Sequence, residues 1–327
     1  MDFPDIDWEA APLVRPNGRE LPEGLRIGER ARAFFVRHPH KRGEVRLRVF
    51  LARPGGTPRG SIILHPGRTE FIEKYFETIE DLVARGFVVL AIDPRGQGLS
   101  DRLQSDALKS YVGRYLHYAD DIGWVQDHLE EMLPRPHIIL GHSMGGLAVL
   151  QAAIEGRSDA DYVVASAPML GLWDIATPMP RYVFRTLDAF GLGSRDLPFQ
   201  KQERGIPIDF PDNKLTSDPV RFKAWREYFL EVPELRVAGP TVRWIAEGLR
   251  AMAKTMRRAE RLTTPTLLFA PGADPIVDPS SIREFARRSG ADVITVPGAR
   301  HELFLEQDEY RDQFFEGLDD WLEAQGV

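Results

Sequence analysis

Short, almost uninterrupted apolar runs recur along the chain, and amphipathic stretches of helical length separate them. The runs are rich in Val, Ile and Leu and lie at residues 61–65, 87–92, 137–140, 162–166, 266–270 and 293–296. Helical periodicity predicts helices over residues 71–85, 117–132, 145–155, 280–289 and 306–324. Short runs that are apolar at every position are typical of parallel strands buried on both faces. The pattern therefore predicts an α/β protein with a mostly parallel central sheet and helices on both faces.

Two further strands are expected before this alternation begins. Residues 31–37 and 44–52 are rich in β-branched and aromatic side chains, and the Pro- and Gly-rich segment 54–58 after them is a predicted turn.

The alternation stops near residue 170 and resumes near residue 264. The residues between, 171–262, form helical pieces separated by prolines, while the flanking runs belong to one sheet series. We therefore expect one core domain made of residues 1–170 and 263–327, with residues 171–262 inserted between two strands as a helical cap.

A candidate nucleophile lies in the sequence GHSMGG at residues 141–146, directly after the apolar run 137–140 and directly before a predicted helix. This G-x-S-x-G pattern in a strand–turn–helix context indicates a nucleophile elbow, in which Ser143 projects from a tight turn at a helix N-terminus. The free N–H groups and the helix dipole at that position favour a developing negative charge. A Gly- and Ser-containing turn with no catalytic role is the alternative interpretation.

A serine hydroxyl needs a base, and the base needs an acid that orients it. In α/β proteins whose nucleophile lies in such an elbow, the chain order of the triad is Ser, then Asp or Glu, then His. Of the eight histidines, His301 is the one that lies well after Ser143, in the loop that follows the run 293–296. Asp274 is the expected acid because it comes first after the run 266–270, and Asp278 is the alternative or a helix N-cap.

Two backbone N–H groups are needed to stabilise the oxyanion of an acyl-transfer reaction. Met144, directly after the nucleophile, is the first expected donor. The second should come from the loop after the run 61–65, where Pro66 has no N–H and leaves Gly67 or Arg68. We expect Gly67, since glycine lets the backbone approach a substrate closely.

Composition excludes several other chemistries. The chain of 327 residues has no cysteine, which removes thiolate nucleophiles, iron–sulfur clusters and Cys-ligated zinc. Its net charge of −7 argues against a nucleic-acid partner. The acidic N-terminus lacks the pattern of a signal peptide, and no apolar run is long enough to span a bilayer. We therefore expect a cytoplasmic protein that can contact the inner membrane peripherally.

Basic residues gather near the end of the predicted cap, at Lys254, Arg257, Arg258 and Arg261. A solvated helix face is the favoured interpretation, and contact with phospholipid head groups is the alternative.

These motifs together resemble the α/β-hydrolase superfamily, and more narrowly the bacterial lysophospholipase L2 and monoacylglycerol lipase group, labelled serine aminopeptidase S33-like. The matching stretches are residues 65–102, 141–146, 166–170, 213–222, 233–252, 272–278 and 298–302. Many members have a His-Gly pair where this chain has His65-Pro66-Gly67-Arg68, and the Pro-Gly-Arg form resembles the lysophospholipase subgroup.

The resemblance implies a serine hydrolase that cleaves a small-molecule acyl ester, such as a lysophospholipid or a monoacylglycerol, through an acyl-enzyme on Ser143. The same triad also serves peptidases, lactonases and acyltransferases, which stay open as alternatives. A non-catalytic binding protein is less favoured, since candidates for all three triad positions are present. No metal or organic cofactor is expected, and the sequence does not indicate an oligomeric state.

Overall fold

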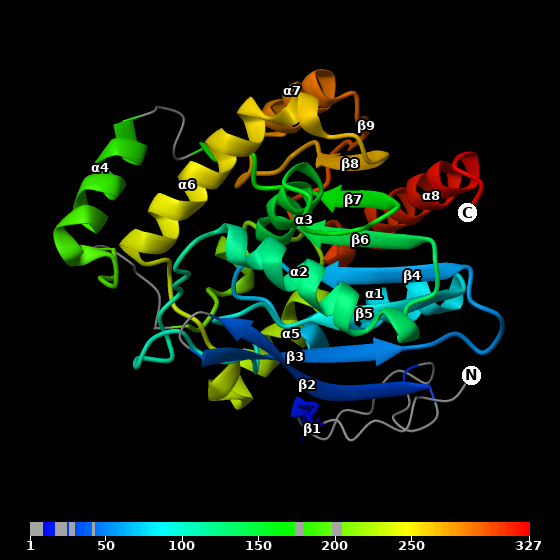
Figure 1. Ribbon diagram of the computed structural model, residues 1–327, viewed down its shortest axis with the longest axis horizontal. Helices are drawn as coiled ribbons and strands as arrows, with labels where there is room; N and C mark the ends of the chain where they lie inside the picture. Colours follow the sequence, from blue (N-terminus) through cyan, green and yellow to red (C-terminus); the bar gives the residue numbers. More distant parts are fainter. Residues whose placement is uncertain (1–8, 17–24, 26–29, 41–42, 174–178, 198–204) are drawn as a thin grey trace.

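A computed structural model of the protein describes residues 9–16, 25, 30–40, 43–173, 179–197 and 205–327. Within these residues one sheet contains nine strands in the order β1-β2-β3-β5-β4-β6-β7-β8-β9 (Figure 1). Their bounds are β1 (Glu9–Ala10), β2 (Ala31–His40), β3 (Gly43–Ala52), β4 (Gly60–His65), β5 (Phe87–Ile92), β6 (His137–His142), β7 (Tyr162–Ser166), β8 (Thr266–Pro271) and β9 (Asp292–Val296).

The sheet is mixed at one end and parallel over the rest of its width. β1, β2 and β3 pair in antiparallel fashion, and β3 pairs antiparallel to β5. From β5 to β9 every neighbouring pair is parallel. The predicted, mostly parallel sheet is therefore confirmed. Each predicted strand is present within about two residues of its expected bounds, except that β2 continues three residues further, to His40.

Helices cover both faces of this sheet (Figure 1). One hydrophobic core contains side chains of α2 (Leu116–His128), α3 (Met144–Ile154) and α7 (Pro279–Ser289). The other contains side chains of α1 (Phe76–Ala84) and α8 (Asp308–Ala324). Consecutive strand residues divide between the two cores, because side chains alternate along a strand. Ile63 lies in the first core and Ile62 in the second.

The segment that was expected to form a cap connects β7 and β8, which are direct neighbours in the sheet. Its described part includes α4 (Met179–Leu187), α5 (Pro219–Glu231) and α6 (Val242–Arg257). Side chains of α6 join the first core, those of α5 join the second, and α4 packs on α6 (Figure 1). Residues 174–178 and 198–204 of the predicted cap lie outside the described residues, and the division into core and cap stays a prediction.

A fully buried arginine joins strand β3 to the segments that precede α1 and follow β5. The Arg48 guanidinium donates to Glu73 at 2.6 and 2.7 Å and to Asp93 at 2.7 Å. Asp93 also accepts the backbone N–H groups of Ile72 and Leu99. One cation thus fixes the loop that leads into α1, on which part of the candidate site lies.

Removing this cation should be costly, because two buried carboxylates would lose their partner. We expect Arg48→Met to lower the free energy of unfolding by about 3–5 kcal/mol. Arg46→Met is the matched control on the same strand, since its partners Glu9 and Asp101 are both partly exposed to solvent, and it should cost about 1 kcal/mol or less. Urea denaturation of both variants measures the difference. Equal losses would show that the buried cluster contributes no more than a surface pair.

Candidate active site

The predicted site residues gather at one edge of the sheet. They lie in the loops that follow β4, β6, β8 and β9, and these four strands run in the same direction. Because the carboxyl ends of parallel strands meet at a common edge, residues far apart in the sequence lie side by side there.

Ser143 lies between β6 and α3 in a backbone conformation that side-chain-bearing residues rarely adopt, with φ of 52° and ψ of −111°. Such a conformation costs on the order of 1–3 kcal/mol and persists only where the surroundings impose it. Here the Ser143 N–H donates to the Ser166 carbonyl, and the Ser143 carbonyl accepts from the N–H groups of Leu147 and Met169. The end of β7 and the first turn of α3 thus hold the strained residue in place.

Two glycines let the strand and the helix approach each other at this turn. A β-carbon at Gly145 would lie 2.1 Å from the His65 carbonyl oxygen, and one at Gly141 would lie 2.3 Å from the Gly145 carbonyl oxygen. Both distances are shorter than any side chain tolerates. The spacing of glycines around Ser143 is therefore a packing requirement between β4, β6 and α3.

The structure brings Ser143, His301 and Asp274 into one hydrogen-bonded chain. His301 Nε2 lies 2.9 Å from Ser143 Oγ, and His301 Nδ1 lies 2.7 Å from Asp274 Oδ2. The other Asp274 oxygen accepts the backbone N–H groups of Ile276 and Val277 at 2.8 and 3.0 Å. The carboxylate is therefore fixed on both sides, and His301 is oriented toward the hydroxyl.

Asp278, the alternative acid, lies elsewhere and has a different contact. Its carboxylate accepts the backbone N–H and the hydroxyl of Ser280 at 2.8 and 2.6 Å, which makes it the N-cap of α7. From the sequence, the N-cap is the second possible role of Asp278, besides that of the acid.

The electrostatics of the His301 side chain favour its protonated form. Burial lowers the pKa of His301, but the charge of Asp274 and its hydrogen bond outweigh burial and raise the pKa above the ordinary value of 6.5. A histidine in this setting can take a proton from Ser143 Oγ and be stabilised as an imidazolium.

The amide groups of the loop after β4 do not all point toward Ser143. The Gly67 N–H, which sequence reasoning favoured as an oxyanion donor, donates instead to the Glu70 carboxylate. Pro66 has no N–H to offer. Arg68 and Ser143 line the same pocket, and Met144 is the first residue of α3.

A buried cluster of charged residues, which the sequence did not indicate, lies beside the triad. Lys74 Nζ donates to Glu70 at 2.8 Å and to Glu302 at 2.6 Å, and Glu70 also accepts the Tyr75 hydroxyl. Burial works against ionisation of Glu70, but Lys74 and His142 outweigh it and hold the pKa of Glu70 below its ordinary value. Burial, together with the charge of Glu70, raises the pKa of Glu302 to about 7. In the sequence these residues are notable only for their positions, since Glu70 follows Gly67 closely and Glu302 directly follows His301.

Three residues of this region have the composition of a metal site. Ligand atoms of Glu70, His142 and Glu302 lie within 4.8 Å of one another. The ammonium group of Lys74, however, already binds both carboxylates. A cation is thus built into the chain at this point, and a metal ion would have to displace it.

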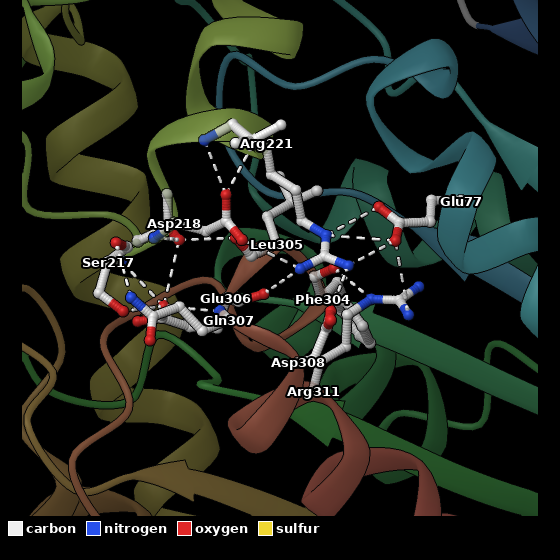
Figure 2. Close-up of polar contacts among 12 residues, drawn as sticks. Glu77, Ser217, Asp218, Arg221, Phe304, Leu305, Glu306, Gln307, Asp308 and Arg311 are labelled. Atoms are coloured by element: carbon white, nitrogen blue, oxygen red, sulfur yellow. Dashed lines mark hydrogen bonds and ion pairs between the residues drawn. The ribbon is translucent and has the colours of Figure 1, made fainter.

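A second network holds the loop that carries His301. The buried Glu306 accepts the N–H of Arg300 with one carboxylate oxygen and the N–H and hydroxyl of Ser217 with the other. Figure 2 shows how Arg221 continues this network, donating to the Glu306 carbonyl at 2.8 Å and to Glu77 at 2.7 Å. The segment before α5, the His301 loop and α1 are therefore fixed relative to one another.

A pocket of about 300 Å³ opens onto Ser143. Residues of the predicted cap supply much of its lining, and most of these are apolar: Ile206, Pro207, Ile208, Leu215, Phe222, Trp225, Phe229, Val237 and Ala238. The triad end is polar, with His142, His301, Glu70 and Lys74 in the wall. A ligand with an apolar chain and a polar end fits this division.

Comparison with known proteins places this geometry in a family. The family model described as serine aminopeptidase, S33 matches residues 56–308. The chain is 31% identical over 274 residues to lysophospholipase L2 of Escherichia coli strain K12, a match that covers 76% of each protein. The chain belongs to the serine aminopeptidase S33 family.

Further members and structures extend this assignment. Homo sapiens monoglyceride lipase is 26% identical over 274 residues, which cover 83% of this chain and 84% of that protein. The crystal structure of Paleococcus ferrophilus monoacylglycerol lipase matches with a TM-score of 0.65 at 24% identity, over 84% of this chain and 98% of that one. The α/β-hydrolase fold is confirmed, and the protein is an enzyme of the serine hydrolase class. Within the described residues, no helix is both long and apolar enough to cross a membrane.

Proposed function

We propose that the protein hydrolyses carboxylic esters of acyl chains through an acyl-enzyme formed on Ser143. The observation that carries this proposal is the continuous chain of hydrogen bonds from Asp274 through His301 to Ser143, in the wall of a pocket whose cap residues are mostly apolar. Family relatives named as lysophospholipases and monoglyceride lipases support an ester substrate.

In this mechanism His301 takes the Ser143 proton as the hydroxyl attacks the ester carbonyl carbon. The imidazolium then gives that proton to the leaving alcohol, and an acyl-enzyme remains. A water molecule, deprotonated by the same histidine, attacks the acyl-enzyme and releases the fatty acid. Asp274 stabilises the imidazolium in both steps.

The oxyanion is stabilised, in this proposal, by the backbone N–H groups of Met144 and Arg68. Arg68 replaces Gly67 in this role because the Gly67 N–H is already taken by Glu70. Glu70 would thus set the direction of the loop, so that the next amide faces the reacting carbonyl.

A lysophospholipid or a monoacylglycerol is the proposed substrate. An amide substrate with a free amine is less well served, since a peptidase of this kind needs an unpaired carboxylate for the amine. The carboxylates in the pocket, Glu70 and Glu302, both bind Lys74.

The proposed reaction is tested by product analysis across lysophospholipids, monoacylglycerols, short-chain aryl esters and aminoacyl arylamides. We expect turnover of the esters, and Ser143→Ala should lower kcat by at least about a thousandfold without loss of fold. Circular dichroism and thermal melting control for folding. Turnover confined to the arylamides would contradict the ester proposal, and activity retained in Ser143→Ala would remove the nucleophile assignment.

The acid assignment predicts a difference between two aspartates of the same loop. Asp274→Asn should lower kcat/KM by about a hundredfold or more, because His301 loses the group that orients it and stabilises its charge. Asp278→Asn should change it by less than about threefold, since asparagine is an equally good N-cap.

The pH profile gives an independent readout of the same assignment. His301 must be neutral to act as a base, so kcat/KM should rise with pH through a pKa above 6.5 in the unmodified enzyme. In Asp274→Asn the raising cause is gone while burial still lowers the pKa, so the residual activity should extend to lower pH. An unchanged acid limb in Asp274→Asn would contradict the role of Asp274.

We further propose that α4 and the turn after it contact a membrane surface peripherally. Met179, Tyr182 and Val183 recur at helical spacing and are exposed, and Phe190 beyond the helix is 79% exposed. Between α4 and α6 lies a pocket of about 550 Å³ lined by five arginines, at positions 181, 185, 243, 250 and 257. Apolar side chains next to arginines suit an anionic lipid surface.

This contact is tested by sedimentation with phosphatidylcholine vesicles that do or do not contain phosphatidylglycerol. We expect binding to the anionic vesicles, and the double variant Met179→Ser/Val183→Ser should lower the bound fraction about threefold or more, because burial of each apolar side chain favours the bound state. Val220→Ser is the control, since Val220 is 75% exposed on α5. Equal losses in both variants would contradict a contact through α4.

A further inference from the structure

A positively charged side chain without a carboxylate partner lies in the pocket next to the nucleophile. Arg68 lines the same pocket as Ser143 and His301. Its Nη1 donates to the Ala238 carbonyl at 3.2 Å, and its Cζ lies 5.7 Å from the centre of the Trp244 ring. Both partners are uncharged, and no ion pair joins Arg68 to a carboxylate among the described residues.

Three of the buried arginines contrast with Arg68 in their partners. Arg48, Arg95 and Arg311 are buried, and each binds at least one carboxylate directly. Burial lowers the pKa of Arg68 to about 10, so the guanidinium is still charged at neutral pH but poorly solvated. A cation in this setting favours any ligand that supplies the missing negative charge.

The other charged groups of the pocket do not supply that charge. Lys74 binds both Glu70 and Glu302, so these two carboxylates already face a cation. Lys214, at the exposed side of the lining, adds a further positive charge. With three cations against two carboxylates, the pocket lining carries a net positive charge.

We propose that the Arg68 guanidinium binds the phosphate of a phosphorylated headgroup, so that lysophospholipids are preferred over neutral monoacylglycerols. This inference rests on the proposed function. Arginine offers two parallel N–H groups that match a phosphate, and such charge-assisted hydrogen bonds are strong.

The covalent geometry of the substrate agrees with this placement. In a lysophospholipid the carbonyl carbon and the phosphorus are separated by as many bonds as the backbone nitrogen and the guanidinium carbon of an arginine. If the Arg68 N–H faces the reacting carbonyl oxygen, its side chain can extend along the glycerol and reach the phosphate. A monoacylglycerol ends in a hydroxyl at that point and leaves the cation without a counter-charge.

The test compares oleoyl lysophosphatidylglycerol with monooleoylglycerol in the same nonionic-detergent micelles, because the two share the acyl chain and the reacting ester. Arg68→Gln keeps the backbone N–H and removes the charge. We expect the ratio of kcat/KM for the phospholipid to that for the neutral lipid to fall about tenfold to a hundredfold, mainly through KM. Arg68→Lys should restore part of the ratio, since it keeps the charge but not the fork.

Arg157→Gln is the matched control. Arg157 pairs with Asp120 outside the pocket and is largely exposed, so its loss removes one positive charge without touching the site. The ratio of kcat/KM for the phospholipid to that for the neutral lipid should stay within about twofold of the ratio for the unmodified enzyme, because exposed charges are screened by salt.

Inhibition of aryl-ester turnover distinguishes a lipid headgroup from free phosphate. Glycerol phosphate should compete with the aryl ester more strongly than inorganic phosphate does, and Arg68→Gln should weaken that competition. An unchanged substrate ratio in Arg68→Gln, or equal inhibition by inorganic phosphate and glycerol phosphate, would overturn the assignment of Arg68. So would an enzyme that cleaves monooleoylglycerol and not the phospholipid. Failure of the unmodified enzyme on every acyl ester would instead contradict the proposed function.

Discussion

The ammonium group of Lys74 lies between two buried carboxylates, and the loops around Ser143 are joined through it. Glu70 belongs to the loop after β4, and Glu302 directly follows His301 in the loop after β9. Two carboxylates this close could not both stay ionised without a cation between them. Lys74 therefore allows Glu70 to remain charged and to accept the Gly67 N–H. It also joins the loop after β9, which carries His301, to the loop after β4. The geometry of both loops depends on this one buried cation.

The backbone of Ser143 is strained, as is that of Thr69 in the same pocket. At Ser143 the surrounding contacts hold the strained conformation. Its unusual φ and ψ are balanced by hydrogen bonds to the end of β7 and by close packing against His65. A loop with fewer contacts would relax, and the hydroxyl would no longer face His301 Nε2. Rigid strands on either side thus supply the accuracy that the proposed acyl transfer requires.

Much of the fold was predictable because the signals were local. A run of apolar residues predicts a buried parallel strand, and glycines around a serine predict a nucleophile elbow. Short windows of sequence were therefore enough to predict the sheet, its helices and the position of Ser143. β1 was missed because a pair of exposed residues, Glu9 and Ala10, has no pattern of its own. The Lys74 cluster was missed for a different reason. Lys74 and Glu302 are 228 positions apart, and only the tertiary fold brings them into contact.

The loop after β4 contains a hydrogen bond that residue type does not report. Glycine was favoured at position 67 for its small size, but the direction of an amide depends on its hydrogen-bond partner, and Glu70 takes that N–H. The preference for glycine at a position does not report which acceptor its N–H will find.

The two proposals give position 68 two functions in one residue, one for its backbone amide and one for its guanidinium. Every residue except proline has a backbone N–H, so any other substitution here leaves the proposed oxyanion donor in place. Natural variation at this single codon could therefore retune which headgroups related enzymes accept while the chemistry stays constant. Such a position offers a short mutational route between lipid specificities.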